Sequence, residues 1–148
     1  MNEQVKTLLV GLSFLVVDDE PDNVGVVVRL LRLLGATVSS AEDGKHGLEV
    51  ARQIAPDVII ADLSMPTMSG WEMLFQIRQD SVLKDTPVIA LTAHAMAGDR
   101  ERALEAGFNS YIPKPIDVPK FVPQLVDILR SIPQTASHFD EVSRRIAI

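Results

Sequence analysis

Val58-Ile59-Ile60-Ala61, followed by Asp62, is the stretch that decides the fold this sequence predicts. The run is short, apolar and mostly β-branched, which is typical of a strand with both faces buried. Such strands belong to parallel sheets that carry helices on each side. Asp62 then marks the carboxyl end of this strand, and a loop through Gly70 leads into the next helix.

Similar apolar runs recur on both sides of this segment and alternate with stretches of helical period. Strands are predicted at residues 13–17, 36–40, 58–61, 88–91 and 110–112. Helices are predicted from Pro21 to Leu34, from the Asp43-Gly44 cap to Ile54, and at residues 71–79, 96–106 and 118–129. Pro123 leaves open a later start of the last helix.

Strands that alternate with helices predict an α/β fold with a parallel sheet. Right-handed crossovers and too few units for an eight-stranded barrel favour an open, doubly wound sheet of five strands. The expected strand order is the flavodoxin-like 2-1-3-4-5, with helices on both faces. In such sheets ligands bind outside the carboxyl ends of the strands, so functional residues are expected there.

Composition narrows the class of protein. The chain has 148 residues, a formal net charge of −6 and no cysteine. An acidic chain without a basic cluster is a poor binder of nucleic acid or anionic lipid, and disulfides and thiolate chemistry are excluded. The apolar run at residues 8–17 is too short to span a bilayer and lacks a signal-peptide cleavage pattern, so it is interpreted as a lead-in and a buried strand.

Polar residues follow four of the predicted strands directly or closely. Strands 1, 3, 4 and 5 are neighbours in the predicted order, so these side chains converge on one crevice. The residues are Asp18, Asp19 and Glu20 after the first strand, Asp62 after the third, Thr92 after the fourth and Lys114 after the fifth.

Clustered carboxylates repel one another unless a cation lies among them. Hard oxygen ligands at an open site favour Mg²⁺, with Mn²⁺ as a possible substitute. A carboxylate can also attack a phosphoryl group and form an acyl phosphate. In that chemistry Lys114 supplies a positive charge and Thr92 a hydroxyl donor to the phosphoryl oxygens.

At residues 12–131 the chain resembles the receiver domain of two-component response regulators, of the single-domain chemotaxis type. Four motifs carry the resemblance in the order expected for the family. They are VVDDEPDN at 16–23, IIADLSMPTMSG at 59–70, ALTAHA at 90–95 and YIPKPI at 111–116.

The resemblance implies a role for each matching residue. Asp62 is the implied phosphoacceptor, and Lys114 and Thr92 the residues that contact the phosphoryl group. The implied metal ligands are Asp18, Asp19, Asp62 and the backbone carbonyl of Ser64. Thr92 and Tyr111 form the implied switch pair, Ser64 and His94 tune the phosphoryl lifetime, and the Lys114–Pro115 bond is expected to be cis.

The implied function is a cytoplasmic signalling switch. A sensor histidine kinase or a histidine phosphotransfer protein donates the phosphoryl group to Asp62 in a Mg²⁺-dependent reaction. The chain is then not an enzyme, since it catalyses only its own phosphotransfer and autodephosphorylation. A downstream protein is expected to bind the face made by the fourth helix, fifth strand and fifth helix, with no direct contact to nucleic acid or membrane.

Residues 1–11 are interpreted as a lead-in and residues 132–148 as a tail without a DNA-binding effector domain. The tail is predicted to be flexible, with a short amphipathic helix through Phe139, Val142 and Ile146 as the alternative. A free-standing protein is preferred to a receiver from a hybrid kinase.

Rival functions fit the sequence less well than the switch. A pseudo-receiver, an interaction module that takes no phosphoryl group, conflicts with the complete acidic set and Lys114. A flavodoxin would need a phosphate loop of Ser, Thr and Gly after the first strand, where this chain has Asp-Asp-Glu. An aspartate-nucleophile phosphatase would place its nucleophile on the first strand, with a second Asp two residues on, where this chain has Glu20.

Overall fold

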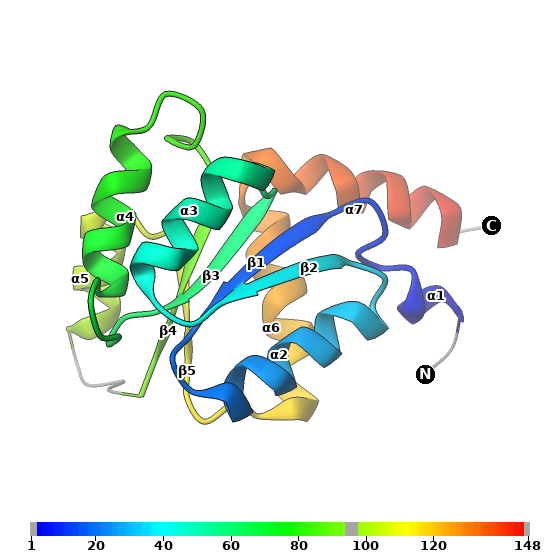
Figure 1. The fold of residues 1–148 in the computed structure, drawn as a ribbon. Helices are drawn as coiled ribbons and strands as arrows, with labels where there is room; N and C mark the ends of the chain where they lie inside the picture. The colour runs from blue at the N-terminus through cyan, green and yellow to red at the C-terminus, as the bar shows by residue number, and fades with distance from the viewer. Residues whose placement is uncertain (1–2, 94–97, 147–148) are drawn as a thin grey trace.

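In a computed structural model, which describes residues 3–93 and 98–146, the chain forms one five-stranded sheet with helices on both faces (Figure 1). All neighbouring strands are parallel and their order is β2-β1-β3-β4-β5, as the sequence predicted. The strands are β1 (Ser13–Val17), β2 (Thr37–Ala41), β3 (Val58–Asp62), β4 (Val88–Thr92) and β5 (Ser110–Pro113).

The predicted helices are present, except that residues 96–97 of the predicted 96–106 helix lie outside the described residues, and further helices are added towards the two ends of the chain. They are α1 (Glu3–Lys6), α2 (Pro21–Leu33), α3 (Gly44–Ile54), α4 (Gly70–Gln79), α5 (Asp99–Ala106), α6 (Val118–Ser131) and α7 (Pro133–Ile146). Among the described residues, none of these helices has the length and apolar character to cross a bilayer.

Side chains that alternate between the two faces of the central strands form two hydrophobic cores, one on each side of the sheet. On β1, Phe14 and Val16 face a core shared with α2 and α6, whereas Leu15 and Val17 face a core shared with α3 and α4. Because successive strand residues point to opposite faces, a central strand with buried apolar residues on both faces requires helices on both sides. Figure 1 shows this division, with α2 and α6 on one face and α3, α4 and α5 on the other.

The last helix of the sheet unit begins at Val118 despite Pro123. Asp117 caps it by accepting a hydrogen bond from the Lys120 amide at 3.3 Å. Phe121 is fully buried, and Pro123 lies on the exposed side, where water can reach the carbonyl that the missing N–H leaves unpaired. The later start that Pro123 suggested is therefore wrong.

The prediction of a flexible tail is also wrong, because residues 133–146 form α7. Phe139 is only 2% exposed and belongs to the core of the α2–α6 face. Gln134 Nε2 donates to Asp85 O at 2.7 Å, just before β4, and His138 Nε2 lies 2.7 Å from Leu8 O, before β1. Helix α7 therefore crosses the edge of the sheet where the strands begin (Figure 1).

The packing of α7 predicts a large energetic contribution from one side chain. Replacing Phe139 by Ala should lower the free energy of unfolding by about 3–5 kcal/mol, because it empties a buried site in the core. Chemical denaturation measures this difference. The matched control is Asp140→Ala, which changes the exposed neighbour and should cost no more than about 0.5 kcal/mol. Equal effects from both variants would contradict the assignment of α7 to the core.

Candidate functional site

The carboxyl ends of β1 and β3 place two carboxylates side by side. Asp18 is 1% exposed and Asp62 is 5% exposed, so both charges are withdrawn from water. Asp18 Oδ1 accepts a hydrogen bond from the Glu20 amide at 2.9 Å, and Asp62 Oδ1 accepts one from the Ser64 amide at 3.3 Å. Each carboxylate is thus oriented by the loop that follows its own strand.

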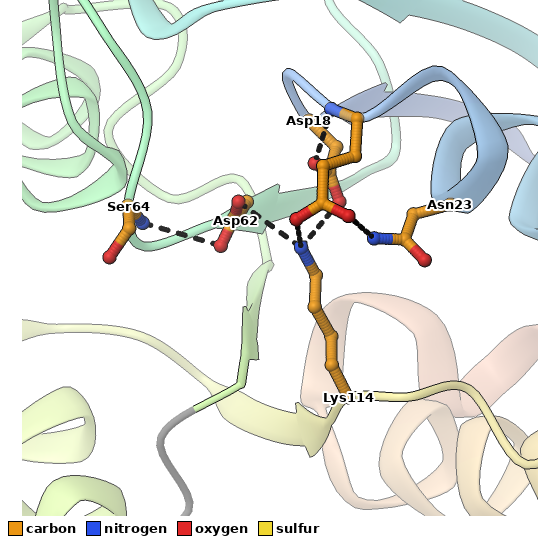
Figure 2. Close-up of polar contacts among 6 residues, drawn as sticks. Asp18, Asn23, Asp62, Ser64 and Lys114 are labelled. Atoms are coloured by element: carbon orange, nitrogen blue, oxygen red, sulfur yellow. Dashed lines mark hydrogen bonds and ion pairs between the residues drawn. The ribbon is translucent and has the colours of Figure 1, made fainter.

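Lys114 joins the two carboxylates. Its Nζ lies 2.9 Å from Asp18 Oδ2 and 3.2 Å from Asp62 Oδ2 (Figure 2). The convergence that the sequence predicted for these residues is therefore present. The Lys114 amide donates to Thr92 O at 2.7 Å, which fixes the lysine against the end of β4. The Lys114–Pro115 bond is cis, as expected.

These contacts change the acidity of the buried groups. Burial and the neighbouring charge of Asp18 raise the pKa of Asp62, and Lys114 and the Ser64 amide only partly offset them. Burial lowers the pKa of Lys114, but its hydrogen bond and ion pair with Asp18, together with Asp62, outweigh that effect, so the net shift is upward. The lysine is consequently held as an ammonium ion between its acidic partners.

Asp19 and Glu20 form the outer part of the site. Both are exposed, and their carboxylate oxygens lie within 4.8 Å of one another and of one from Asp18. Glu20 Oε1 lies 3.8 Å from Lys114 Nζ, and Glu20 Oε2 accepts a hydrogen bond from Asn23 at 2.9 Å. An open cluster of hard carboxylate oxygens fits a divalent cation such as Mg²⁺, which binds through few protein ligands and keeps several waters.

Inside that cluster, one oxygen is not saturated. Asp18 Oδ2 is buried and its partner among the described residues is the ammonium of Lys114, with no further hydrogen bond. A carboxylate oxygen accepts more than one contact. Asp18 can therefore serve a cation without losing its hydrogen bond to the Glu20 amide.

The remaining predicted residues lie in different places. Thr92 ends β4 and is 3% exposed, next to the Lys114 backbone. Tyr111 is half-buried on β5, opposite Ala90, where it lines a shallow hollow with Arg100 and Gln124. Ser64 is exposed. His94 lies outside the described residues, and the roles assigned to all these residues stay predictions.

Glu20 is the site residue that sequence reasoning undervalued, because the motif match assigned the metal to its two neighbours. A signal was available in the sequence. Asn23 stands three residues after Glu20, so a turn of helix brings the two side chains together, as their hydrogen bond shows.

The comparisons with known proteins agree with this geometry. Residues 14–126 match the family model described as "Response regulator receiver domain". The chain belongs to the response regulator receiver family. Receiver domains are phosphoacceptor switches of two-component signalling, and they interact with histidine kinases and with downstream targets.

Individual relatives lie at moderate identity. The polar-differentiation response regulator DivK of Brucella anthropi is 37% identical over 110 residues, which cover 74% of this chain and 89% of DivK. The chemotaxis response regulator CheY4 of Vibrio cholerae superimposes with a TM-score of 0.75 at 30% identity, over 80% of this chain and 98% of that one.

One similar receiver has been solved with a bound metal ion. The receiver domain of the sensor histidine kinase PA1611 from Pseudomonas aeruginosa PAO1 is 35% identical, with a TM-score of 0.71, over 79% of this chain and 96% of that one. Its structure has a magnesium ion coordinated in the active site cleft.

The raised pKa of Asp62 predicts a pH-dependent stability of the metal-free protein. Between the ordinary carboxyl pKa of 3.8 and the raised value, the folded state binds more protons than the unfolded state, so stability falls as the pH rises through that window. In EDTA at pH 7, Asp62→Asn should therefore melt at a higher temperature than the native protein. The difference should shrink as the pH falls below the window.

The matched control is Asp22→Asn, which removes an exposed carboxylate from the first turn of α2 and should not raise the melting temperature. Melting curves in EDTA across acidic and neutral pH measure both variants. A destabilised Asp62→Asn at pH 7 would mean that the ion pair with Lys114 outweighs burial and repulsion, which would contradict the upward shift of the Asp62 pKa.

Proposed function

We propose that this receiver accepts a phosphoryl group on Asp62 and uses it to switch its affinity for a protein partner. The observation that carries the proposal is the position of Lys114 Nζ, 3.2 Å from Asp62 and 2.9 Å from Asp18. A buried ammonium that bridges an acceptor and a metal-type carboxylate is suited to a phosphoryl group, because it offsets the charge that builds up during transfer.

The proposed donor is the phosphohistidine of a sensor histidine kinase or of a histidine phosphotransfer protein. A carboxylate oxygen of Asp62 attacks the phosphorus, the new P–O bond forms an acyl phosphate, and the P–N bond breaks so that its electron pair returns to the imidazole. Lys114 contacts the transferred oxygens, and the Thr92 hydroxyl donates to another of them. Hydrolysis of the acyl phosphate later restores Asp62.

Mg²⁺ is the proposed cofactor, with Mn²⁺ as a substitute, and when bound it supplies positive charge that offsets the repulsion between Asp62 and the phosphoryl group. Asp18, Asp19, Asp62 and the Ser64 carbonyl would hold it. Glu20, which lies beside Asp18 and Asp19, adds negative charge that attracts the cation. The magnesium in the PA1611 receiver supports this assignment.

The proposed output is a shift between two conformations. Thr92 is drawn toward the phosphoryl group, and Tyr111 changes its position on β5. Tyr111 lines a hollow with Arg100 on α5 and Gln124 on α6, so the α5–β5–α6 face is the proposed surface for the downstream protein. The acidic chain is proposed to work in the cytoplasm without direct contact to nucleic acid or membrane.

The domain boundaries are proposed to be 12–131 for the receiver, with 1–11 before it and 132–148 after it. Because Phe139 of α7 is buried in the core of this unit, residues 133–146 are expected to act as part of the same folded body.

Acetyl phosphate tests the acceptor directly. Incubation with acetyl phosphate and Mg²⁺, followed by intact mass measurement, should give one phosphoryl adduct that is absent in EDTA. The adduct should be lost in Asp62→Asn and kept in Asp22→Asn, which changes an exposed carboxylate at the start of α2. A native protein without an adduct would instead favour a pseudo-receiver, and an adduct that survives in Asp62→Asn would place the acceptor elsewhere.

A further inference from the structure

The loop between β3 and α4 has an unusual turn. Met68 N donates to Pro66 O at 2.7 Å, and Thr67 between them has a φ of 66°. A hydrogen bond across three residues with a positive φ at the centre is a strained γ-turn, and it is rarer still for a β-branched residue. Such a conformation persists only where the surroundings hold it in place.

One contact from another element holds this turn. The amide of Gly44, the first residue of α3, donates to Met68 O at 3.1 Å. The first amides of a helix have no partner inside the helix, and the Asp43 side chain already caps the amide of His46 at 2.8 Å. The Gly44 amide is therefore available to fix the loop.

Gly44 is also the residue type that this contact requires. A Cβ at position 44 would lie 2.3 Å from Met68 O and 3.0 Å from both the carbonyl carbon and the Cβ of Met68. The nearest obstacle is backbone, which cannot rotate away as a side chain can. Any larger residue must push the loop away from α3 and lengthen or break the hydrogen bond.

The other end of the loop is fixed to the site itself. Gly70 N donates to Leu63 O at 3.1 Å, and a Cβ at Gly70 would lie 2.2 Å from Asp62 O. The loop is therefore held at Leu63 by the Gly70 amide and at Met68 by the Gly44 amide. A displacement of Met68 moves the segment between these two positions, which contains Ser64.

We propose that Gly44 is a positioning residue that holds the β3–α4 loop in the geometry needed for metal binding and phosphoryl transfer at Asp62. This inference deepens the proposed function and rests on it. Gly44 acts through the Met68 carbonyl and the Ser64 segment and contacts neither reactant. Its contribution comes from its missing side chain and from the hydrogen bond that its amide donates.

The chain offers a matched pair of variants. Gly47 lies one turn further along α3, and a Cβ there would also be crowded, at 2.8 and 2.9 Å from the Val17 methyl groups and 3.1 Å from Met73 Sδ. Those neighbours are side chains of the core and belong to no part of the β3–α4 loop. Gly44→Ala and Gly47→Ala thus share the helix, the substitution and the crowding, and they differ in whether the loop is displaced.

The measurements are the Mg²⁺ dissociation constant by calorimetry, the rate of phosphorylation by acetyl phosphate and the denaturation midpoint. Gly44→Ala should weaken Mg²⁺ binding by about 10-fold or more, as losses of ligand-orienting contacts do, and should slow phosphorylation. Gly47→Ala should keep the Mg²⁺ dissociation constant within about 2-fold of the native value even where its midpoint falls. Equal effects of the two variants on Mg²⁺ binding, or none from Gly44→Ala, would overturn the inference.

Hydrogen exchange on the native protein gives a test that does not depend on the folding of a variant. Added Mg²⁺ should slow exchange of the Gly44 amide, because the metal stabilises the loop to which that amide is bonded. Unchanged exchange of this amide on Mg²⁺ binding would overturn the inference. A native protein that neither binds Mg²⁺ nor forms an adduct would overturn the proposed function as well, whereas one that does both while Gly44→Ala behaves identically would overturn the positioning role alone.

Discussion

The ion pairs of Lys114 with Asp18 and Asp62 are the interaction on which the rest of the site depends. The three side chains are 6%, 0% and 7% exposed, so all three charges have lost most of their hydration. Two buried carboxylates without compensation would repel each other and take up protons. The Lys114 ammonium reduces the repulsion between the two carboxylates but does not neutralise both of them. Asp19 and Glu20 extend the remaining negative charge to the surface. The same arrangement therefore limits the cost of burying two carboxylates in the metal-free protein and attracts a cation.

The two edges of the sheet have opposite character. At the carboxyl edge β3 and β4 end in Asp62 and Thr92, and charged side chains follow β1 and β5 directly at Asp18 and Lys114. At the amino edge α7 crosses the starts of β4 and β1 and buries Phe139 in the core. The apolar side chains buried by α7 at the amino edge stabilise the fold. This stability allows the carboxyl edge to hold buried charges that oppose folding. In open α/β sheets, ligands bind outside this carboxyl edge.

The loop after β3 combines a strained backbone at Thr67 with the charged side chain of Asp62, which directly precedes it. Thr67 holds a positive φ, and the two glycines that clamp this loop allow backbone approaches that no side chain would permit. Asp62 lies at the start of this loop, and the Ser64 amide orients its carboxylate. A rigid loop is of use here because a metal ligand or an acceptor that is displaced by a fraction of an ångström loses much of its effect.

The sequence by itself determined the sheet order, the strands within about one residue and the residues at their carboxyl ends. It could do so because apolar period and strand-end position are local properties. The sequence pattern predicted that β3 ends at Ala61 and β4 at Leu91. In the structure, pairing with neighbouring strands extends each strand by one residue, to Asp62 and Thr92.

Only the tertiary structure decided the contacts between distant segments. It set the distances from Lys114 to its two carboxylates, the docking of α7 beside residue 8, and the approach of Gly44 to Met68. The physical reason is that these contacts depend on how whole elements pack. A tail with few apolar residues is predicted to be flexible, because the sequence does not show the core in which Phe139 is buried. The role of Gly44, the first residue of α3, becomes visible only when the Met68 carbonyl lies against it.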